Sequence, residues 1–567
     1  MRLLGTYGNR MGWLVLAILF FLILLPLAAV IIQVLLPGVF FGQWNTGDLS
    51  LLLDVFTRPL WLASLKNSLY LGVGTTVFAT ALGCALAIVR SRWSFQTARL
   101  LDLAVWVLLI TPSFILAQGW VMFAAADGLA NAWLGWTWIT SLVFSPEGLV
   151  VVMSLSKFPL AYLAIASALE WKVDRLGEAA RLCGSSLWTV WRTVELPLLL
   201  PAICSGALLV FMDTIGDFGL PASIAAVFRF PTLPYSIYSA LYTSPIRFDM
   251  AGVLSFYLVL LIVAAMSIQF YVMRKARFDV LSSRATRQER KTTKRGSMWL
   301  NIGCISFLLV VIGIPFGANL LMSISDTSSM DQGLQGLTLR HYEELFANGE
   351  ALLDGLLHSL GIAATAGIIG LIVGFFVAYV LTYSPFKYRR AVDVISLVSL
   401  AVPGVVLGIG YIFVWNQRWL EPIGLLLYGT PWILALASVA GAIPIITRVI
   451  VGAMAKVPGQ LLAAAQMQGA SFVQRVRWIL LPLIRGALVA AGLSAFGSSV
   501  FDLAATSILF PPDFMTLPVF INKAFEDLKF AYAAASTLMG GGLVVLIIVI
   551  VELLFQPKKW KAGRDHA

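Results

Sequence analysis

Twelve long apolar runs, separated by shorter polar stretches, constrain this chain more than any other feature of its sequence. They cover about residues 11–36, 67–89, 100–120, 148–170, 198–216, 251–273, 298–323, 358–383, 391–415, 431–452, 483–501 and 533–555. A helix needs about 20 apolar residues to cross a membrane, because its backbone groups must bond internally where water is absent. Since 59% of the residues are hydrophobic and only 12% are charged, we expect an all-α membrane protein with about twelve spans. The first run is expected to be a retained span and not a cleaved leader.

The basic residues indicate which way the spans run. Lys and Arg gather in alternate loops, as is typical of the cytoplasmic side of a membrane. The stretch 274–295 carries nine of them, so we expect it to be a cytoplasmic linker that touches anionic lipids. Both termini then lie in the cytoplasm. The net charge of +11 follows from this topology, and the scattered basic residues do not suggest a partner made of nucleic acid.

Polar and helix-breaking residues of the two halves repeat in register. At an offset of 291 residues, Asp102 matches Asp393, Pro112 matches Pro403 and Gly119 matches Gly410. At an offset of 285, Pro159 matches Pro444, Gly184 matches Gly469 and Asp217 matches Asp502. We therefore expect a tandem duplication, with a six-span unit at 1–273, a basic linker at 274–297 and a second six-span unit at 298–567. Both units have the same orientation, and a transport path between them follows naturally.

The polar loop between the fourth and fifth runs of each half carries one shared pattern. Three consecutive residues are followed, after three more, by a glycine, and then by a Leu-Pro pair. The first copy has Glu178, Ala179, Ala180 and Gly184, and the second has Ala463, Ala464, Ala465 and Gly469. Alanine favours a short helix whose backbone approaches a partner closely, and glycine permits a tight exit from it. Pro197 and Pro482 suit the first turn of the following span.

This pattern resembles the EAA signature of the inner-membrane permeases of binding-protein-dependent ABC importers. The resemblance implies a tandem pair of type I permease units in a bacterial inner membrane. It also implies that both segments are coupling helices, which dock on two copies of a cytoplasmic ATPase subunit, and that a periplasmic or lipid-anchored solute-binding protein delivers the cargo. Ala463 stands where the second copy should have Glu, so docking is expected to be asymmetric.

The chain is expected to be a transport subunit and not an enzyme. No GxxxxGK[ST] loop for binding nucleotide phosphates occurs in its sequence. ATP and Mg²⁺ are therefore expected on the separate ATPase subunits, and no cofactor on this chain. The three histidines, His341, His358 and His566, have no metal-ligand spacing.

Three aspartates are candidates for the translocation pathway. Asp213 and Asp217 are four residues apart and share a helical face, and Asp502 is the repeat partner of Asp217. Acidic residues near a membrane usually face a cavity or a partner, and a ring of three carboxylates would suit a cation. The alternative is that these residues cap helix ends or hold the two halves together.

The resemblance covers nearly the whole chain and is greatest to the ferric-iron group, while fused permeases for thiamine and for 2-aminoethylphosphonate look similar. Two functions of other classes remain as alternatives. An ion-coupled secondary transporter would work without an ATPase, and a membrane scaffold or sensor would have no central cavity. The EAA spacing argues against the secondary transporter, as does an expected lack of charged pairs buried in the middle of a span.

Overall fold

The computed structural model describes residues 2–36, 39–41, 50–170, 180–275, 294–326, 336–347 and 349–555. These residues form helices joined by loops, with an isolated β-bridge between Ser325 and Leu337. Within these described ranges, eleven helices are long and apolar enough to cross a membrane, and a twelfth span results if one bent pair is counted as a span. The expected all-helical membrane fold is confirmed. Residues 276–293 of the expected linker lie outside the described residues, so the linker stays a prediction.

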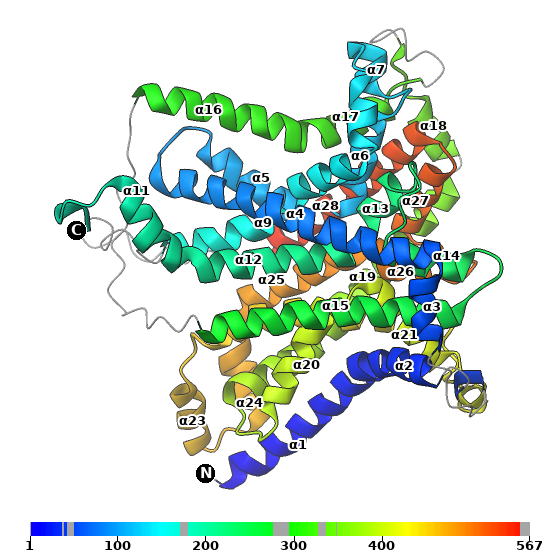
Figure 1. Cartoon of the computed structure of the whole chain (residues 1–567). Coiled ribbons are helices and arrows are strands. Elements are labelled where there is room, and N and C mark those ends of the chain that lie inside the picture. The colour runs from blue at the N-terminus through cyan, green and yellow to red at the C-terminus, as the bar shows by residue number, and fades with distance from the viewer. Residues whose placement is uncertain are drawn as a thin grey trace.

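Each half supplies long helices and shorter connectors (Figure 1). In the first half the long helices are α1 (Arg2–Leu19), α2 (Leu25–Leu35), α4 (Pro59–Arg92), α5 (Ala98–Ile110), α6 (Ser113–Ala124), α9 (Pro146–Glu170), α12 (Leu196–Gly216) and α15 (Phe248–Lys275). The connectors are α3 (Ser50–Thr57), α7 (Leu129–Leu134), α8 (Trp138–Val143), α11 (Leu187–Val190), α13 (Gly219–Ile224) and α14 (Leu233–Tyr242).

The second half follows the same order. Its long helices are α16 (Lys294–Leu308), α17 (Ile314–Ser323), α19 (Gly349–Tyr383), α20 (Arg389–Ala401), α21 (Gly404–Trp415), α22 (Pro431–Met454), α25 (Leu481–Val500) and α28 (Phe530–Phe555). Its connectors are α18 (Arg340–Ala347), α23 (Gly459–Met467), α24 (Phe472–Arg475), α26 (Leu503–Leu509) and α27 (Leu517–Glu526).

The third span of each half is broken, and the expected continuous helices over 100–120 and 391–415 are therefore wrong. The breaks fall at Pro112, between α5 and α6, and at Pro403, between α20 and α21, where the chain bends by 111°. A residue that precedes proline is disfavoured in the helical region, because the proline ring clashes with its backbone. Thr111 and Val402 are accordingly extended, with ψ values of 126° and 125°.

The described residues contain four π-helical turns, and each lies directly before a Leu-Pro or Ile-Pro pair. They cover Phe20–Leu24, Trp191–Glu195, Leu309–Gly313 and Val476–Leu480. Proline donates no backbone hydrogen bond and clashes with the carbonyl four residues earlier, and a wider turn relieves this conflict without ending the helix. The helix before each π turn and the helix after it therefore form one continuous helical segment, which we call a rod.

The first span of each half packs against the other half. Helix α2 lies along α21, and α17 lies along α6. At both crossings a repeated glycine faces a backbone carbonyl of the incoming helix: Gly119 faces Pro315, and Gly410 faces Pro26. The carbonyl of Leu22, which Pro26 deprives of its usual helical donor, lies 2.9 Å from the hydroxyl of the fully buried Tyr411. The first span of each half, which we call its arm, thus joins the two halves through close backbone contact.

The duplication extends to individual hydrogen bonds. The Ser68 hydroxyl accepts a 2.8 Å bond from the Leu233 amide, and its repeat partner Ser359 accepts a 2.8 Å bond from Leu517. The repeated aspartates are both paired with arginine, but from different helices. Asp102 pairs with Arg90 of α4, whereas Asp393 pairs with Arg448 of α22. The repeat therefore conserves the position of the carboxylate and varies the source of its counter-charge.

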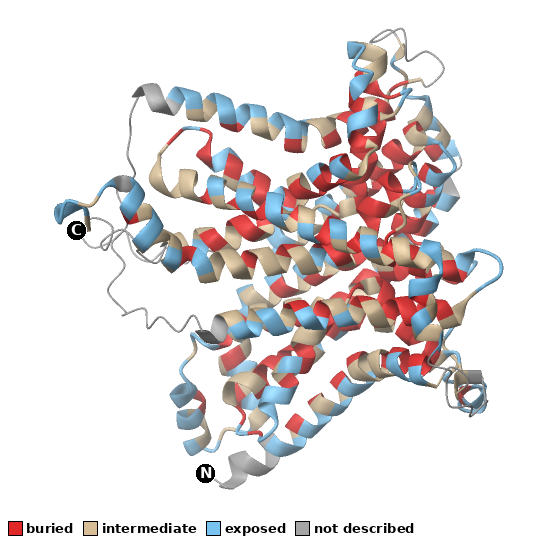
Figure 2. Cartoon of the chain, in the orientation of Figure 1, coloured by how far each residue is buried: buried red, intermediate tan, exposed pale blue. Residues whose placement is uncertain are grey.

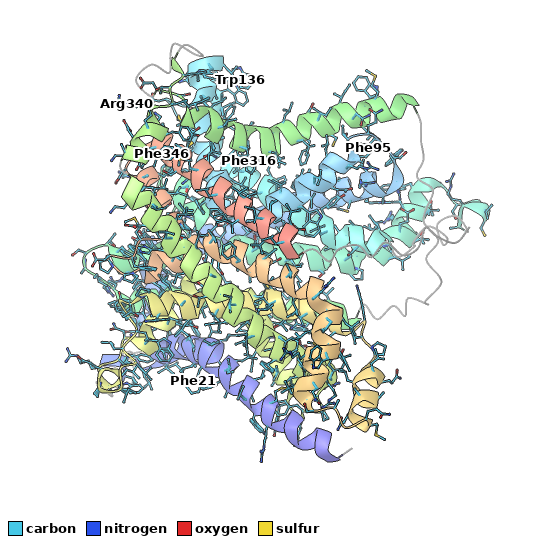
Figure 3. All side chains as sticks on the ribbon, turned by 180° about the vertical axis from the view of Figure 1, so that it is seen from behind. Phe21, Phe95, Trp136, Phe316, Arg340 and Phe346 are labelled. Atoms are coloured by element: carbon cyan, nitrogen blue, oxygen red, sulfur yellow. The ribbon has the colours of Figure 1, made fainter. Side chains whose placement is uncertain are left out.

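The bundle buries its core unevenly along its length (Figure 2). Buried residues gather toward the end that carries α14, α26 and α27, while the end with α11 and α23 is mostly intermediate or exposed. Along the spans many large apolar side chains face outward, among them Phe21 and Phe78; Phe21 is labelled in Figure 3. Lipid chains solvate such surfaces, as expected for a membrane protein.

Candidate functional site

The second copy of the shared loop pattern forms a short helix with a tight exit. Ala463, Ala464 and Ala465 lie inside α23, and Gly469 follows with a φ of +84°. In that left-handed conformation the Gly469 amide donates to Gln466, and the Ala470 amide donates to Ala465. These two bonds form a Schellman motif, for which glycine is the favoured residue.

The first copy ends in the same way. Gly184 has a φ of +88°, its amide donates to Arg181, and the Ser185 amide donates to Ala180. Glu178 and Ala179 lie outside the described residues. The matching exits support the expected role of both glycines as turn residues, while docking of an ATPase stays a prediction.

A continuous rod leads from each exit into the membrane. After Gly469, Ser471 caps α24 in a reciprocal pair of bonds with Gln474, and the helix runs on through its π turn into α25. The matching rod of the first half passes through α11 into α12. The two rods measure 29 residues each, Trp188–Gly216 and Phe472–Val500. Each loop is therefore joined by a continuous helix to the far end of its span.

The most exposed large apolar side chains of the described residues sit at the tips of these loops. Leu182 is 90% exposed and its repeat partner Met467 is 87% exposed. Both precede the left-handed glycine by two residues. The loops lie at one end of the molecule, which we call the coupling face and define by α11 and α23 (Figure 1). The two exposed side chains are candidates for contact with a partner, and that role stays a prediction.

The far ends of the rods meet the broken third spans. Gly216, at the end of α12, lies against Pro403 of the other half, where an added Cβ would be 3.0 Å from the ring. Phe501, directly after α25, lines a cavity together with Pro112. Each rod therefore ends where the opposite half breaks its helix.

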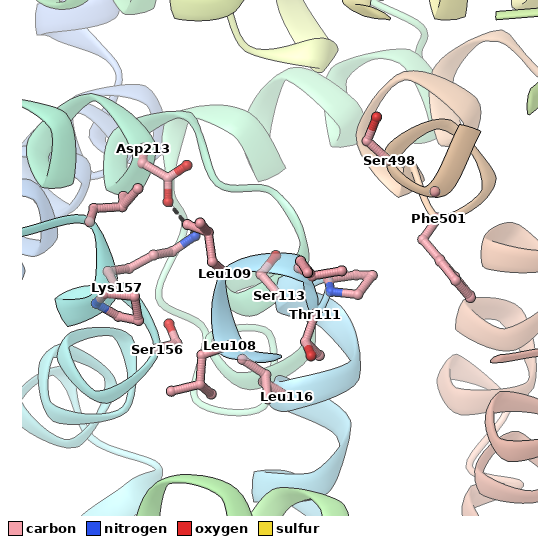
Figure 4. Close-up of a pocket in the computed structure, with 15 residues that line it drawn as sticks. Leu108, Leu109, Thr111, Ser113, Leu116, Ser156, Lys157, Asp213, Ser498 and Phe501 are labelled. Carbon is pink, nitrogen blue, oxygen red and sulfur yellow. Dashed lines mark ion pairs between the residues drawn. The ribbon is translucent and has the colours of Figure 1, made fainter. Parts of the chain in front are cut away.

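That cavity lies between the halves and has a volume of about 270 Å³. The first half lines it with the α5–α6 break, Lys157 and Asp213, and the second half lines it with Gly497, Ser498 and Phe501. Figure 4 shows Asp213 and Lys157 on one side of the cavity and Ser498 and Phe501 on the other. A polar group and a charged pair thus face each other across the interface of the repeats.

Lys157 forms ion pairs with two of the three expected pathway aspartates, Asp213 and Asp217. It lies near the middle of α9, and its Nζ is 2.6 Å from Asp213 Oδ2 and 2.8 Å from Asp217 Oδ2. Asp217 also accepts a 2.7 Å bond from the Ser113 hydroxyl and a 3.3 Å bond from the amide of Leu220, the second residue of α13. The expected lack of charged pairs in the middle of a span is therefore wrong. A lysine within an apolar run is itself a signal of function, but the sequence does not show its partners, because Asp213 and Asp217 lie more than 50 residues away.

The three carboxylates do not form a ring around the cavity. Only Asp213 lines it. Asp217 is turned toward the start of α13, and Asp502 caps α26 by accepting a 3.1 Å bond from the Ala505 amide. The backbone leaves the helical conformation at both repeated aspartates, and its free amides need acceptors where water is excluded. This geometry gives Asp217 and Asp502 a capping position.

The family model for the inner membrane component of binding-protein-dependent transport systems matches residues 79–278 and 370–556. One match falls in each repeat, and each includes that repeat's copy of the shared loop pattern. The chain belongs to this family. Its tandem duplication is thereby confirmed, and it is a multi-pass permease of the inner membrane.

Individual relatives cover this permease to different extents. A putative ferric transport system permease of Haemophilus influenzae is 22% identical over 88% of this chain and 77% of its own length. A second Fe(3+)-transport system permease of that organism is 24% identical over 93% of this chain and 95% of its own length. The molybdenum transport system permease of Escherichia coli is 33% identical, over 33% of this chain and 81% of its own length. The ferric relatives match both halves, whereas the molybdenum relative matches a third of the chain.

The capping position of Asp502 predicts how the permease responds to substitution there. Asp502→Ala removes the acceptor for the Ala505 amide and should lower the free energy of unfolding by about 1 kcal/mol. Asp502→Asn keeps a capping oxygen and should melt close to wild type. Thermal melting of the purified permease in detergent measures both. Equal loss in the two variants would show that the negative charge, and not the cap, is what the site requires.

Proposed function

We propose that this chain is the membrane-spanning permease of an ATP-driven importer of ferric iron. The observation that carries the proposal is the pair of coupling loops, which present matching apolar tips at one face and continue as rods to the cavity between the halves. Membership of the permease family supports the importer class. The ferric relatives, which align with both halves, support the cargo.

The partners follow from this assignment. Two copies of an ATPase subunit dock at the coupling face, one on each loop, and they hold the ATP and Mg²⁺. A periplasmic or lipid-anchored solute-binding protein delivers the iron at the opposite face. The coupling face and both termini lie in the cytoplasm, in agreement with the basic residues that surround the loops, among them Arg181, Arg192, Lys456 and Arg477.

The rods connect the ATPase docking sites with the cavity, so that movement of the ATPase subunits can change the shape of the cavity. A helix of 29 residues is about 43 Å long at 1.5 Å per residue, enough to join the membrane surface to its middle. The ends of the two rods carry Asp213 and Ser498, which face the cavity. When the ATPase subunits close, they draw the loops together, and the cavity walls at the other ends of the rods change their separation. The cavity thereby opens to one side of the membrane at a time.

Purification and uptake together test this function. The tagged chain, expressed with its neighbouring genes, should retain a nucleotide-binding subunit, and cells should take up radioactive ferric iron only when that subunit hydrolyses ATP. Uptake that persists with an inactive ATPase would favour an ion-coupled secondary transporter. An absence of uptake for any solute would favour a scaffold or sensor. Uptake of labelled thiamine or 2-aminoethylphosphonate in place of iron would support the assignment as an importer but show that iron is not the cargo.

A further inference from the structure

The charged groups of the cavity all come from one half. Lys157 and Asp213 belong to the first half, and the residues at the matching repeat positions of the second half are Ala442 and Ser498. Other paired positions keep their character, such as Asp217 with Asp502. The duplication has therefore diverged where the two halves face the cavity.

The two carboxylates that share Lys157 differ in exposure. The Asp217 side chain is 3% exposed and is fixed by Ser113 and by the Leu220 amide. The Asp213 side chain is 47% exposed, and Lys157 is its ion-pair partner. Lys157 itself is 13% exposed. Both side chains line the cavity, and the Asp213 carboxylate offers a solute more accessible surface than the ammonium group of Lys157 does.

Charge accounting favours a cation as that solute. Two carboxylates and one ammonium leave the cluster with one net negative charge, and Asp213 is the more exposed of the two charged side chains that line the cavity. A cation can bind Asp213 while Lys157 remains paired with Asp217, so that neither buried charge is left alone. An oxyanion would have to displace a carboxylate to reach the ammonium group.

We propose that Asp213 is the cargo-contacting residue of the cavity and that Lys157 is a built-in competitor, which the cation displaces from Asp213 and which returns when the cation leaves. This inference rests on the proposed function and names a residue and a charge class for it. Transport requires binding that is strong enough for entry and weak enough for exit. A tethered ammonium group that competes for the carboxylate keeps a multivalent cation from being trapped.

The donors around Asp213 suit transient contact with a cation. Within the described ranges, no three His, Cys, Asp or Glu side chains come together in a group that could hold a metal ion. The exposed carboxylate of Asp213 and the hydroxyl groups of Ser156 and Ser498 line the cavity and can bind a cation weakly and briefly. Carboxylate and hydroxyl oxygens are the donors that hard cations prefer.

The test uses the whole importer, reconstituted in vesicles with its ATPase and binding protein, and direct binding of Ga³⁺ as a redox-inert trivalent probe. Asp213→Asn should lower ferric uptake at least tenfold, while Asp54→Asn, which removes a half-buried carboxylate that is paired with Arg58 and does not line the cavity, should transport as wild type does. The double variant Lys157→Met with Asp217→Asn keeps the net charge of the cluster and removes the competitor. It should bind Ga³⁺ at least tenfold more tightly than wild type and release cargo more slowly.

Three outcomes would overturn the inference: wild-type uptake by Asp213→Asn, unchanged Ga³⁺ affinity of the double variant, or faster uptake of an oxyanion by Asp213→Asn. If the double variant fails to fold, Lys157→Arg serves in its place. It keeps the competitor and should transport within about threefold of wild type, whereas a loss as large as that of Asp213→Asn would count against displacement. Because Ga³⁺ binding is measured on the permease itself, it tests the site even if iron proves not to be the cargo.

Discussion

Replacement of Gly119 and Gly410 by alanine is expected to separate the two halves of the permease. A Cβ atom at Gly119 would lie 2.1 Å from the Pro315 carbonyl oxygen, and one at Gly410 would lie 2.4 Å from that of Pro26. Real Cβ atoms do not approach oxygen so closely, and both obstacles are backbone, which cannot rotate away. Overpacking of this kind costs about 1–3 kcal/mol at each site. The double variant should therefore lose most of its folded, monodisperse population.

Thermal melting and size-exclusion chromatography in detergent measure this loss. Gly361 and Gly441 provide the matched control, because each lies inside a helix and an added Cβ would meet nothing within 4 Å. Alanine at those positions should leave the permease as stable as wild type or slightly more so, since glycine is a poor helix former. If the Gly119 and Gly410 variant has the same melting temperature as this control, the first spans do not pack on the opposite halves as the structure has them.

Sequence repeats located these glycines but did not reveal their partners. The register of the halves matched Gly119 with Gly410, yet hydropathy is the same whichever half an apolar helix packs against. The packing of each first span on the other half is decided by tertiary contacts, in which small residues allow two backbones to touch. In the same way, Pro112 and Pro403 were visible as a repeated pair, but the sharp bend that they produce depends on the extended residues before them.

The candidate site was predictable where a motif is local and unpredictable where charges meet through space. The exits at Gly184 and Gly469 follow from a pattern within seven residues, and their positive φ values agree with it. Lys157 lies 56 residues from Asp213 in sequence, and only the packing of α9 on α12 brings them together. Asp502 appeared equivalent to Asp217, but the second half has Ala442 where Lys157 would be needed to build the same cluster.

The double substitution Leu182→Asp and Met467→Asp is expected to release the ATPase subunits. Both side chains are almost fully exposed at the tips of the coupling loops, and burial of such a side chain in a partner contributes about 1.5–3 kcal/mol. An aspartate there forfeits that gain and adds a charge that would have to lose its water on docking. Recovery of the ATPase with the tagged permease should fall at least a hundredfold, and ATP-dependent uptake should fall with it.

The second loop should be the more sensitive of the two. Ala463 leaves it without the acidic residue that stands at the matching position of the first loop, so its apolar tip carries a larger share of the contact. Met467→Asp alone should therefore weaken ATPase recovery more than Leu182→Asp alone. Phe346→Asp is the control, because Phe346 is 74% exposed on α18, at the opposite end of the molecule from the coupling face (Figures 1 and 3). Equal loss from Phe346→Asp would mean that the effect reflects general damage to the permease, and docking through the loop tips would have to be given up.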